Sequence, residues 1–256
     1  MSSLVARDHS PNAAIDIIAR IDDDLPMRYS GGKGKCFQQL INQMPPHTTY
    51  IETHLGGGAV LRHKMPTRRN IGIDLDQALI DRWRARGDAN EYVTSDAVSY
   101  LEGFPFTGDE LVYADPPYML DTRRRPRIYK HEYNDEDHAR LLSALKRLPC
   151  MVMVSGYENP FYEAELAGWR SRRFPAKTHT DVRLETIWMN YPEPTVLHDA
   201  RFLGASFRER QSFQRRRNTL QRRVENMDVT ERTAFLRWMI DTYESELEGV
   251  RCKLPM

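Results

Sequence analysis

Residues 110–118 read Glu110-Leu111-Val112-Tyr113-Ala114-Asp115-Pro116-Pro117-Tyr118. The first five predict a buried strand, and the prolines end it because neither has an N–H group for a sheet hydrogen bond. Asp115 and Tyr118 are therefore expected on a stiff turn at a strand's carboxyl end, where open α/β sheets place their ligands. An accepting acid, a rigid carbonyl and a ring suit a planar base that bears an amino group. A proline-rich turn that only ends a strand explains these residues equally well, so the neighbouring sequence has to decide.

Strands and helices alternate around this stretch. The other expected strands are 48–54, 70–74, 92–94 and 150–155, and the expected helices are 36–44, 59–64, 77–86, 97–101, 135–148 and 161–166. This alternation predicts βαβ units and a mainly parallel sheet. Strands at 170–173 and 184–190, joined by a short loop, predict an antiparallel hairpin at the end of the sheet.

The chain changes character near His198. Residues 202–226 and 230–248 predict two charged helices with no strand between them. The predicted class is therefore α/β: a mainly parallel sheet with a terminal antiparallel hairpin, followed by an Arg-rich helical extension. We divide the chain into an N-terminal arm (1–26), an α/β domain (27–197) and a basic helical extension (198–256).

Composition limits the classes of protein. The chain has 256 residues and a net charge of +1, and it has three cysteines, at positions 36, 150 and 252, without paired spacing. No apolar stretch approaches the ~20 residues of a membrane span, and the N-terminus lacks a signal-peptide core. The eight histidines show no metal-ligand spacing. We therefore expect a cytoplasmic protein with neither membrane nor metal among its partners.

An acidic residue lies at or near the end of each of the first four predicted strands. These acids are Glu52, Asp74, Asp96 and Asp115, and the first of them precedes the glycine turn Gly56-Gly57-Gly58. Such a turn lets the backbone approach a ligand, and strand-end acids accept hydrogen bonds from ribose hydroxyls. The glycines alone are more typical of a plain strand–helix turn, but the acids together predict a nucleoside-type cofactor.

The glycine spacing narrows the choice of cofactor. It does not match the G-x-G-x-x-G of a dinucleotide site, and Gly31-Gly32-Lys33-Gly34-Lys35 lacks the spacing and the preceding strand of a phosphate-binding loop. S-adenosylmethionine carries ribose hydroxyls and an amino-acid end but no phosphate. It is therefore the cofactor that suits these acids better.

In order, the chain contains a Gly-Gly-Lys loop, a Glu followed by a glycine turn, a strand-end Asp and Asp-Pro-Pro-Tyr. It thereby resembles the Dam-like, alpha-group (D12-class) DNA adenine methyltransferases, in particular their compact branch, often phage- or prophage-encoded. The resemblance covers about residues 27–192 and implies a Rossmann-like S-adenosylmethionine-dependent methyltransferase fold, with a possible restriction-modification partner. It also implies cofactor contacts by Tyr29, Gly31, Gly32, Lys33, Glu52, Gly56, Gly57, Gly58, Asp74, Asp96 and Asp115. The implied catalytic residues are Asp115, Pro116, Pro117 and Tyr118, which would hold a flipped adenine.

The chain departs from that family in several places. Thr53 and His54 stand where Pro and an aromatic residue are common, and Tyr29 stands where Trp is usual. Larger relatives carry a target-recognition insert between the second and third strands, but here about twenty residues separate Asp74 from Asp96. Sequence recognition is therefore expected elsewhere in the chain, or to be loose.

The expected chemistry is methylation of the exocyclic N6 amine of adenine. Asp115 would accept one amine hydrogen and the Pro116 carbonyl the other. Attack of the amine nitrogen on the sulfonium methyl group then needs only in-line alignment, so proximity should supply much of the rate. Tyr118 would stack on the base, worth ~1–3 kcal/mol, which offsets part of the cost of flipping it out.

Two basic segments are candidates for contact with DNA. One is the loop after the Asp-Pro-Pro-Tyr motif, and the other is the first helix of the extension. The expected contacts are Arg123, Arg124, Arg125, Arg127, Lys130, Arg208, Arg215, Arg216 and Arg217. A solvated helical face is the alternative for the second segment. Trp238, Met239 and Tyr243 are expected to pack on the core or on a second subunit, which makes a homodimer possible.

Three alternatives stay open. The substrate could be adenine in RNA, or the amine of cytosine, although enzymes of that last kind usually have Ser in place of Asp115. The chain could instead be a catalytically weak DNA-binding protein that uses its Arg-rich helices.

Overall fold

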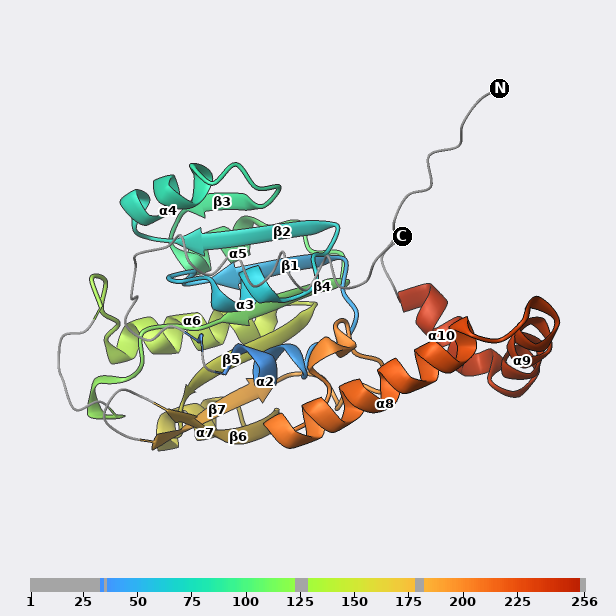
Figure 1. Ribbon diagram of the computed structural model, residues 1–256. Coiled ribbons are helices and arrows are strands. Elements are labelled where there is room, and N and C mark those ends of the chain that lie inside the picture. The colour runs from blue at the N-terminus through green and yellow to red at the C-terminus, as the bar shows by residue number, and fades with distance from the viewer. Residues whose placement is uncertain (1–32, 35, 123–128, 178–181, 254–256) are drawn as a thin grey trace, which may run out of the picture.

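In the computed structural model, the described residues are 33, 34, 36–122, 129–177 and 182–253. Their centre is a seven-stranded sheet with the order β3-β2-β1-β4-β5-β7-β6 (Figure 1). The strands are β1 (Thr49–Thr53), β2 (Arg69–Asp74), β3 (Glu91–Thr94), β4 (Glu110–Ala114), β5 (Met151–Tyr157), β6 (Arg170–Lys177) and β7 (Val182–Met189). Strands β1 to β5 are parallel to one another, and β7 pairs antiparallel with both β5 and β6. The predicted α/β fold, with its parallel sheet and terminal hairpin, is confirmed.

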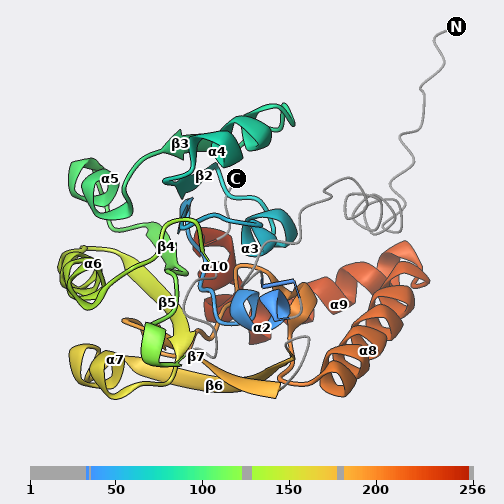
Figure 2. The ribbon, with the colours of Figure 1, turned by 90° about the vertical axis from the view of Figure 1, so that its left-hand side faces the viewer.

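Helices cover both faces of the sheet (Figure 2). One face packs on α2 (Phe37–Ile41), α3 (Ala59–His63) and α4 (Gln77–Arg84). The other packs on α5 (Ala97–Gly103), α6 (Asp135–Arg147) and α7 (Pro160–Glu165). Adjacent residues of β4 serve opposite layers, since Leu111 and Tyr113 belong to the first and Val112 and Ala114 to the second. This alternation is the two-residue period of a strand buried on both faces.

Short polar side chains cap the N-termini of several of these helices. Asn134 and Asp137 form a reciprocal capping box at α6, and Asp96 caps α5 by accepting from Ser99 N. Asp76 caps α4 in the same way. Each cap satisfies an N–H group that a helix start otherwise leaves without a partner, and so fixes where the strand–helix turn ends.

The C-terminal helices differ from those predicted. Instead of 202–226 and 230–248, the structure has η3 (Ala200–Phe202), α8 (Phe207–Glu225), α9 (Val229–Thr242) and α10 (Glu244–Lys253). Gly204, at φ 125°, separates η3 from α8, whose start is capped by Ser206. The first predicted helix is therefore divided where a left-handed glycine and a capping residue favour another conformation. The second is interrupted between Thr242 and Glu244.

The extension is anchored at its beginning and exposed beyond it. His198 N donates to Met44 O and Asp199 accepts from Met65 N, and both side chains are buried. In contrast, α8 and α9 contain no buried residue, and they lie to one side of the sheet (Figure 1). Trp238 and Tyr243 are 51% and 41% exposed, so they do not pack on the core. No helix in the described ranges has the length and apolar character to span a bilayer.

Candidate active site

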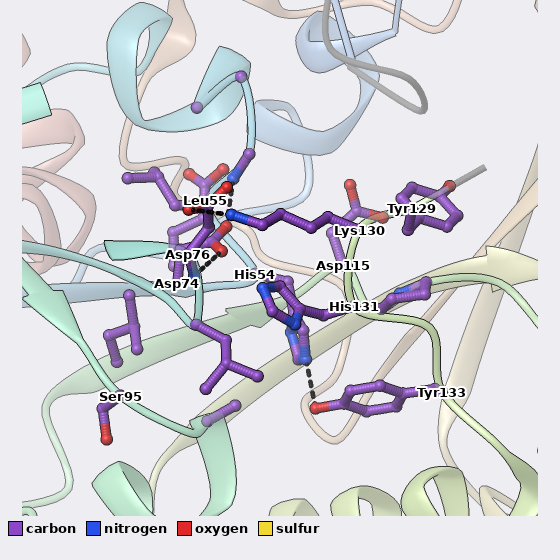
Figure 3. A pocket seen from close by; sticks show the side chains of 18 of the residues that line it. His54, Leu55, Asp74, Asp76, Ser95, Asp115, Tyr129, Lys130, His131 and Tyr133 are labelled. Atoms are coloured by element: carbon purple, nitrogen blue, oxygen red, sulfur yellow. Dashed lines mark hydrogen bonds and ion pairs between the residues drawn. The ribbon is translucent and has the colours of Figure 1, made fainter. Parts of the chain in front are cut away.

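A cavity of about 320 Å³ opens at the carboxyl ends of β1 to β4 (Figure 3). Parallel strands bring their ends to one edge of the sheet, so residues distant in sequence line one space. The lining residues are Lys33, Glu52, His54, Leu55, Gly56, Gly57, Gly58, Ala59, Ile73, Asp74, Leu75, Asp76, Ser95, Asp96, Ala97, Asp115, Pro117, Tyr129, Lys130, His131 and Tyr133. The structure thus brings together every described residue predicted to contact the cofactor.

The turn after β1 forms one wall of this cavity. Gly56 and Gly58 have φ values of 46° and 54°, in the left-handed region where a side chain is strained. A Cβ on Gly58 would approach the Trp83 ring to 2.8 Å, and Trp83 Nε1 donates to Gly56 O. Glycine is therefore required here for a tight turn against α4, whatever binds beside it.

Asp74 and Asp76 lie together where β2 ends. Asp74 accepts from Gly56 N at 3.0 Å and from Asp76 N at 2.9 Å, so it ties the glycine turn to the strand end. Asp76, which is not among the predicted site residues, accepts from Lys130 Nζ at 2.8 Å. That hydrogen bond lowers the pKa of Asp76. Lys130, predicted to contact DNA, is thus an ion-pair partner at the cavity (Figure 3).

Glu52 is buried at the base of the cavity. Its Oε2 accepts from the Tyr50 hydroxyl at 2.9 Å and from Leu61 N at 2.8 Å. Burial raises its pKa to about 8, although both hydrogen bonds oppose the shift. Glu52 therefore holds the start of α3 against β1 in addition to lining the cavity.

Asp96 lies at the opposite side of the cavity, after β3. Beyond capping α5, it accepts from Arg140 at 2.7 Å. Most of the predicted cofactor acids thus already accept protein donors. Since each carboxylate oxygen accepts more than one hydrogen bond, these interactions orient the acids without using up their capacity.

Asp115 belongs to a buried polar network at the end of β4. Its Oδ1 accepts from Lys33 Nζ at 2.7 Å and from the Ser155 hydroxyl at 2.7 Å. The Tyr113 hydroxyl lies 3.0 Å from Ser155 Oγ. Within the described part of the chain, Oδ2 of Asp115 accepts no hydrogen bond. One oxygen is thus anchored, and the other is the available acceptor.

Tyr118 is placed differently from the expected stacking ring. It is 6% exposed and is not among the residues that line the cavity. Lys33 Nζ donates to its hydroxyl, and its ring packs edge-to-face on Tyr157 with centroids 4.4 Å apart. In this conformation the ring supports Lys33, so stacking on a base requires it to turn outward. Pro116 is buried, whereas Pro117 lines the cavity.

His54 is a pocket residue that the sequence showed only as a departure from the family. Its φ is 60°, and it is the one residue other than glycine with a positive φ that the described chain contains. Its Nε2 lies 2.8 Å from the Tyr133 hydroxyl and its Nδ1 lies 3.0 Å from Thr53 Oγ1 (Figure 3). The interaction with Tyr133 joins the β1 turn to the loop before α6, and no local sequence pattern indicates it.

Several predicted residues lie outside the described part of the chain. They are Tyr29, Gly31, Gly32, Arg123, Arg124, Arg125 and Arg127. Arg208, Arg215 and Arg216 are exposed on α8, and Arg217 is partly buried there. The described residues contain no group of three or more His, Cys, Asp or Glu side chains suited to a metal ion.

Neither a scan against protein-family models nor a search of curated proteins finds a match to this sequence. Solved structures with a similar chain path include the 23S rRNA methyltransferase ErmE, with a TM-score of 0.44 and 10% identity over 70% of this chain and 82% of that one. Magnesium protoporphyrin IX methyltransferase from Synechocystis PCC 6803, solved with bound S-adenosylmethionine, has a TM-score of 0.44 and 11% identity over 75% and 100%. A dimethyladenosine transferase from Plasmodium falciparum has a TM-score of 0.39 and 13% identity over 60% and 59%.

Proposed function

We propose that this chain is an S-adenosylmethionine-dependent methyltransferase that modifies the N6 amine of a flipped-out adenine in DNA. The observation that carries the proposal is the placement of Asp115. Its Oδ1 is anchored by Lys33 and Ser155, and its Asp-Pro-Pro turn borders the cavity behind the glycine turn. A fixed acceptor beside a cofactor-sized cavity is what transfer of a group to an amine requires.

The donors and charges of the cavity fit S-adenosylmethionine. Asp74 and Asp76 offer acceptors for ribose hydroxyls at the end of β2. The two lysines that line the cavity already pair with carboxylates, Lys33 with Asp115 and Lys130 with Asp76. A phosphate would therefore lack a matching cation, whereas a cationic sulfonium suits an acidic cavity. When bound, this cofactor supplies an activated methyl group.

The chain's own residues would align the amine and take up its proton. Asp115 Oδ2 would accept one amine hydrogen and the Pro116 carbonyl the other, which directs the nitrogen lone pair toward the methyl carbon. Transfer would move the methyl group from sulfur to nitrogen, with the C–S electron pair remaining on sulfur, and Asp115 would take up the surplus proton from nitrogen. Tyr118 would stack on the base once its ring has turned from Lys33.

The exposed arginines of α8 support a nucleic-acid substrate. This helix has seven arginines and two glutamates, and among the described residues none of its arginines forms an ion pair. Cations without protein partners are suited to binding phosphates. An interaction of DNA with Lys130 stays a prediction, and it would compete with the Lys130–Asp76 ion pair.

RNA is the second candidate substrate. The Asp-Pro-Pro-Tyr residues would bind the amine of adenine and not its sugar, and phosphate binding by α8 does not distinguish the two polymers. A catalytically weak DNA-binding protein would use α8 alone, but it would not explain the anchored Asp115.

Methyl transfer to defined polymers tests the proposal. Purified protein is incubated with S-adenosylmethionine carrying a labelled methyl group and with either unmethylated DNA or an RNA of the same sequence. Nuclease digestion and mass spectrometry should then find N6-methyladenine in the DNA. Good incorporation into RNA with none into DNA would show that RNA is the substrate. No incorporation into either polymer would reject the proposed activity.

A further inference from the structure

Glu185 is a buried carboxylate at the catalytic edge of the sheet that the sequence analysis did not single out. It is 7% exposed, and its Oε2 has no hydrogen-bond partner in the described structure. The antiparallel register of β7 with β5 sets Glu185 opposite Tyr157. Buried polar atoms are nearly always hydrogen-bonded, so a carboxylate oxygen without a partner here calls for an electrostatic explanation.

That explanation is Lys33, which lies between two carboxylates. Its Nζ is 2.7 Å from Asp115 Oδ1 and 3.6 Å from Glu185 Oε2, and Lys33 is 4% exposed. Among the described residues, Lys33 is the one cation within ion-pair distance of either acid. Burial opposes its charge, but Asp115 and then Glu185 outweigh burial and raise the pKa of Lys33 well above its ordinary value. The ammonium group is therefore retained.

One ammonium cannot neutralise two carboxylates. If Lys33 paired with Asp115 alone, the two charges would cancel. Asp115 would then be a weaker acceptor for the target amine, which becomes positively charged during transfer. With Glu185 also ionised, the three groups together carry one negative charge. The pKa of Glu185 is raised by burial and further by Asp115, while Lys33 and a hydrogen bond with Tyr118 oppose the rise. Lys33 is thus the largest influence that favours the ionised form of Glu185.

We propose that Glu185 is a positioning residue that shares the Lys33 ammonium with Asp115 and so leaves negative charge on Asp115 for the target amine. It acts through Lys33 and touches neither substrate nor cofactor. The proposal rests on the proposed function for its catalytic consequence, but the Lys33–Glu185 interaction itself does not depend on any activity.

The activity arm of the test uses Glu185→Gln, which keeps the shape and removes the charge. We expect kcat to fall by about tenfold, the scale of coupling within one polar network. The KM and Kd for S-adenosylmethionine should stay within about twofold. Glu185→Asp should recover most of the loss, and Glu193→Gln, at a side chain 72% exposed, should change nothing. Equal losses in Glu185→Gln and Glu185→Asp would indicate a packing role and overturn the proposal.

The second arm measures stability and needs no substrate. Urea unfolding of wild type, Lys33→Met, Glu185→Gln and the double variant forms a double-mutant cycle. We expect strong coupling: removing the Glu185 charge should stabilise Lys33→Met, which otherwise buries carboxylates without a cation, by clearly more than it changes the stability of wild type. Additive effects would overturn the proposal. If the wild type methylates no nucleic acid, the proposed function fails, and this cycle still decides the inference. If Glu185→Gln does not fold, the same cycle is run with Glu185→Ala, which also removes the charge and for which the same coupling is expected.

Discussion

The catalytic edge of the sheet and helix α8 both concentrate charge, but they satisfy it in opposite ways. At the sheet edge, Lys33 and Asp115 are paired at 2.7 Å, with Lys33 almost fully buried. On α8, Arg208, Arg215 and Arg216 are exposed and have no ion-pair partner among the described residues. Removing one partner of a buried ion pair has a large effect, because it leaves the other charge desolvated and without a partner. Each exposed charge contributes little by itself, and its effect is screened by salt. The two regions should therefore respond differently to substitution.

The largest effect is expected at Asp115. Asp115→Ala removes the proton acceptor, so methyl transfer should fall by about 10²–10⁴-fold, the usual contribution of a positioned general base. Binding of S-adenosylmethionine, measured by calorimetry, should survive because the glycine turn and Asp74 remain. The matched control is Asp109→Ala, an exposed acid just before the opposite end of β4. Comparable activity of the two variants would remove Asp115 from the mechanism.

On α8, a smaller and salt-dependent effect is expected. The triple variant Arg208→Gln, Arg215→Gln, Arg216→Gln should weaken DNA binding without changing kcat at saturating DNA. The slope of log affinity against log salt should decrease by about 0.9 for each phosphate that the variant no longer neutralises. Fluorescence anisotropy over a salt series measures both quantities. Arg147→Gln, whose guanidinium already pairs with Glu102, is the control, and an unchanged slope in the triple variant would assign DNA binding to another surface.

Helix α9 follows α8 in the chain and exposes apolar side chains, among them Leu236, Trp238 and Ile240. The homodimer expected through the C-terminal helices stays a prediction. Light scattering should give twice the mass of one chain, and Trp238→Glu should return the single-chain mass while methyl transfer per chain persists. A wild type that stays monomeric at high concentration would exclude this dimer.

The last expected effect is on the pH dependence of stability at Glu52. Its pKa in the folded protein, about 8, exceeds the ordinary value of 4.5, so the folded state holds the proton more tightly. The stability this contributes is complete below about pH 4.5 and is lost as the pH rises through about 8. Glu52→Gln should therefore gain stability relative to wild type as pH rises, by about 3 kcal/mol near pH 7. Urea unfolding at pH 5 and pH 7.5 measures it, and a difference independent of pH would contradict the assignment.

Local patterns were sufficient for much of the fold. The run 110–114 was predicted as a strand and lies fully buried as β4, because its apolar residues leave no polar face. The prediction was less accurate at the C-terminus, where Gly204 and Ser206 divide the first of the expected helices. The spacing of apolar residues continues across these two positions and so predicts one helix. That spacing carries no information about the backbone conformation of a glycine.

Glu185 and Asp76 show what local patterns could not supply for the site. Asp76 comes just after β2, but its partner Lys130 comes from a loop 54 residues away. Glu185 reaches Lys33 only through the register of the β5–β7 pair. A shift of that register by one residue would turn Glu185 to the other face of the sheet, and no signal within β7 specifies which register is adopted.

The sequence alone determines the order of strand-end acids, glycine turn and Asp-Pro-Pro-Tyr, because strand ends and turns follow from local hydrophobicity and from the backbone constraints of glycine and proline. It does not determine the charge state around Asp115. That charge state depends on which distant side chains, Lys33, Ser155 and Glu185, share its buried surroundings. Electrostatic interactions act through space, so only the folded sheet determines how many carboxylates interact with the ammonium group of Lys33.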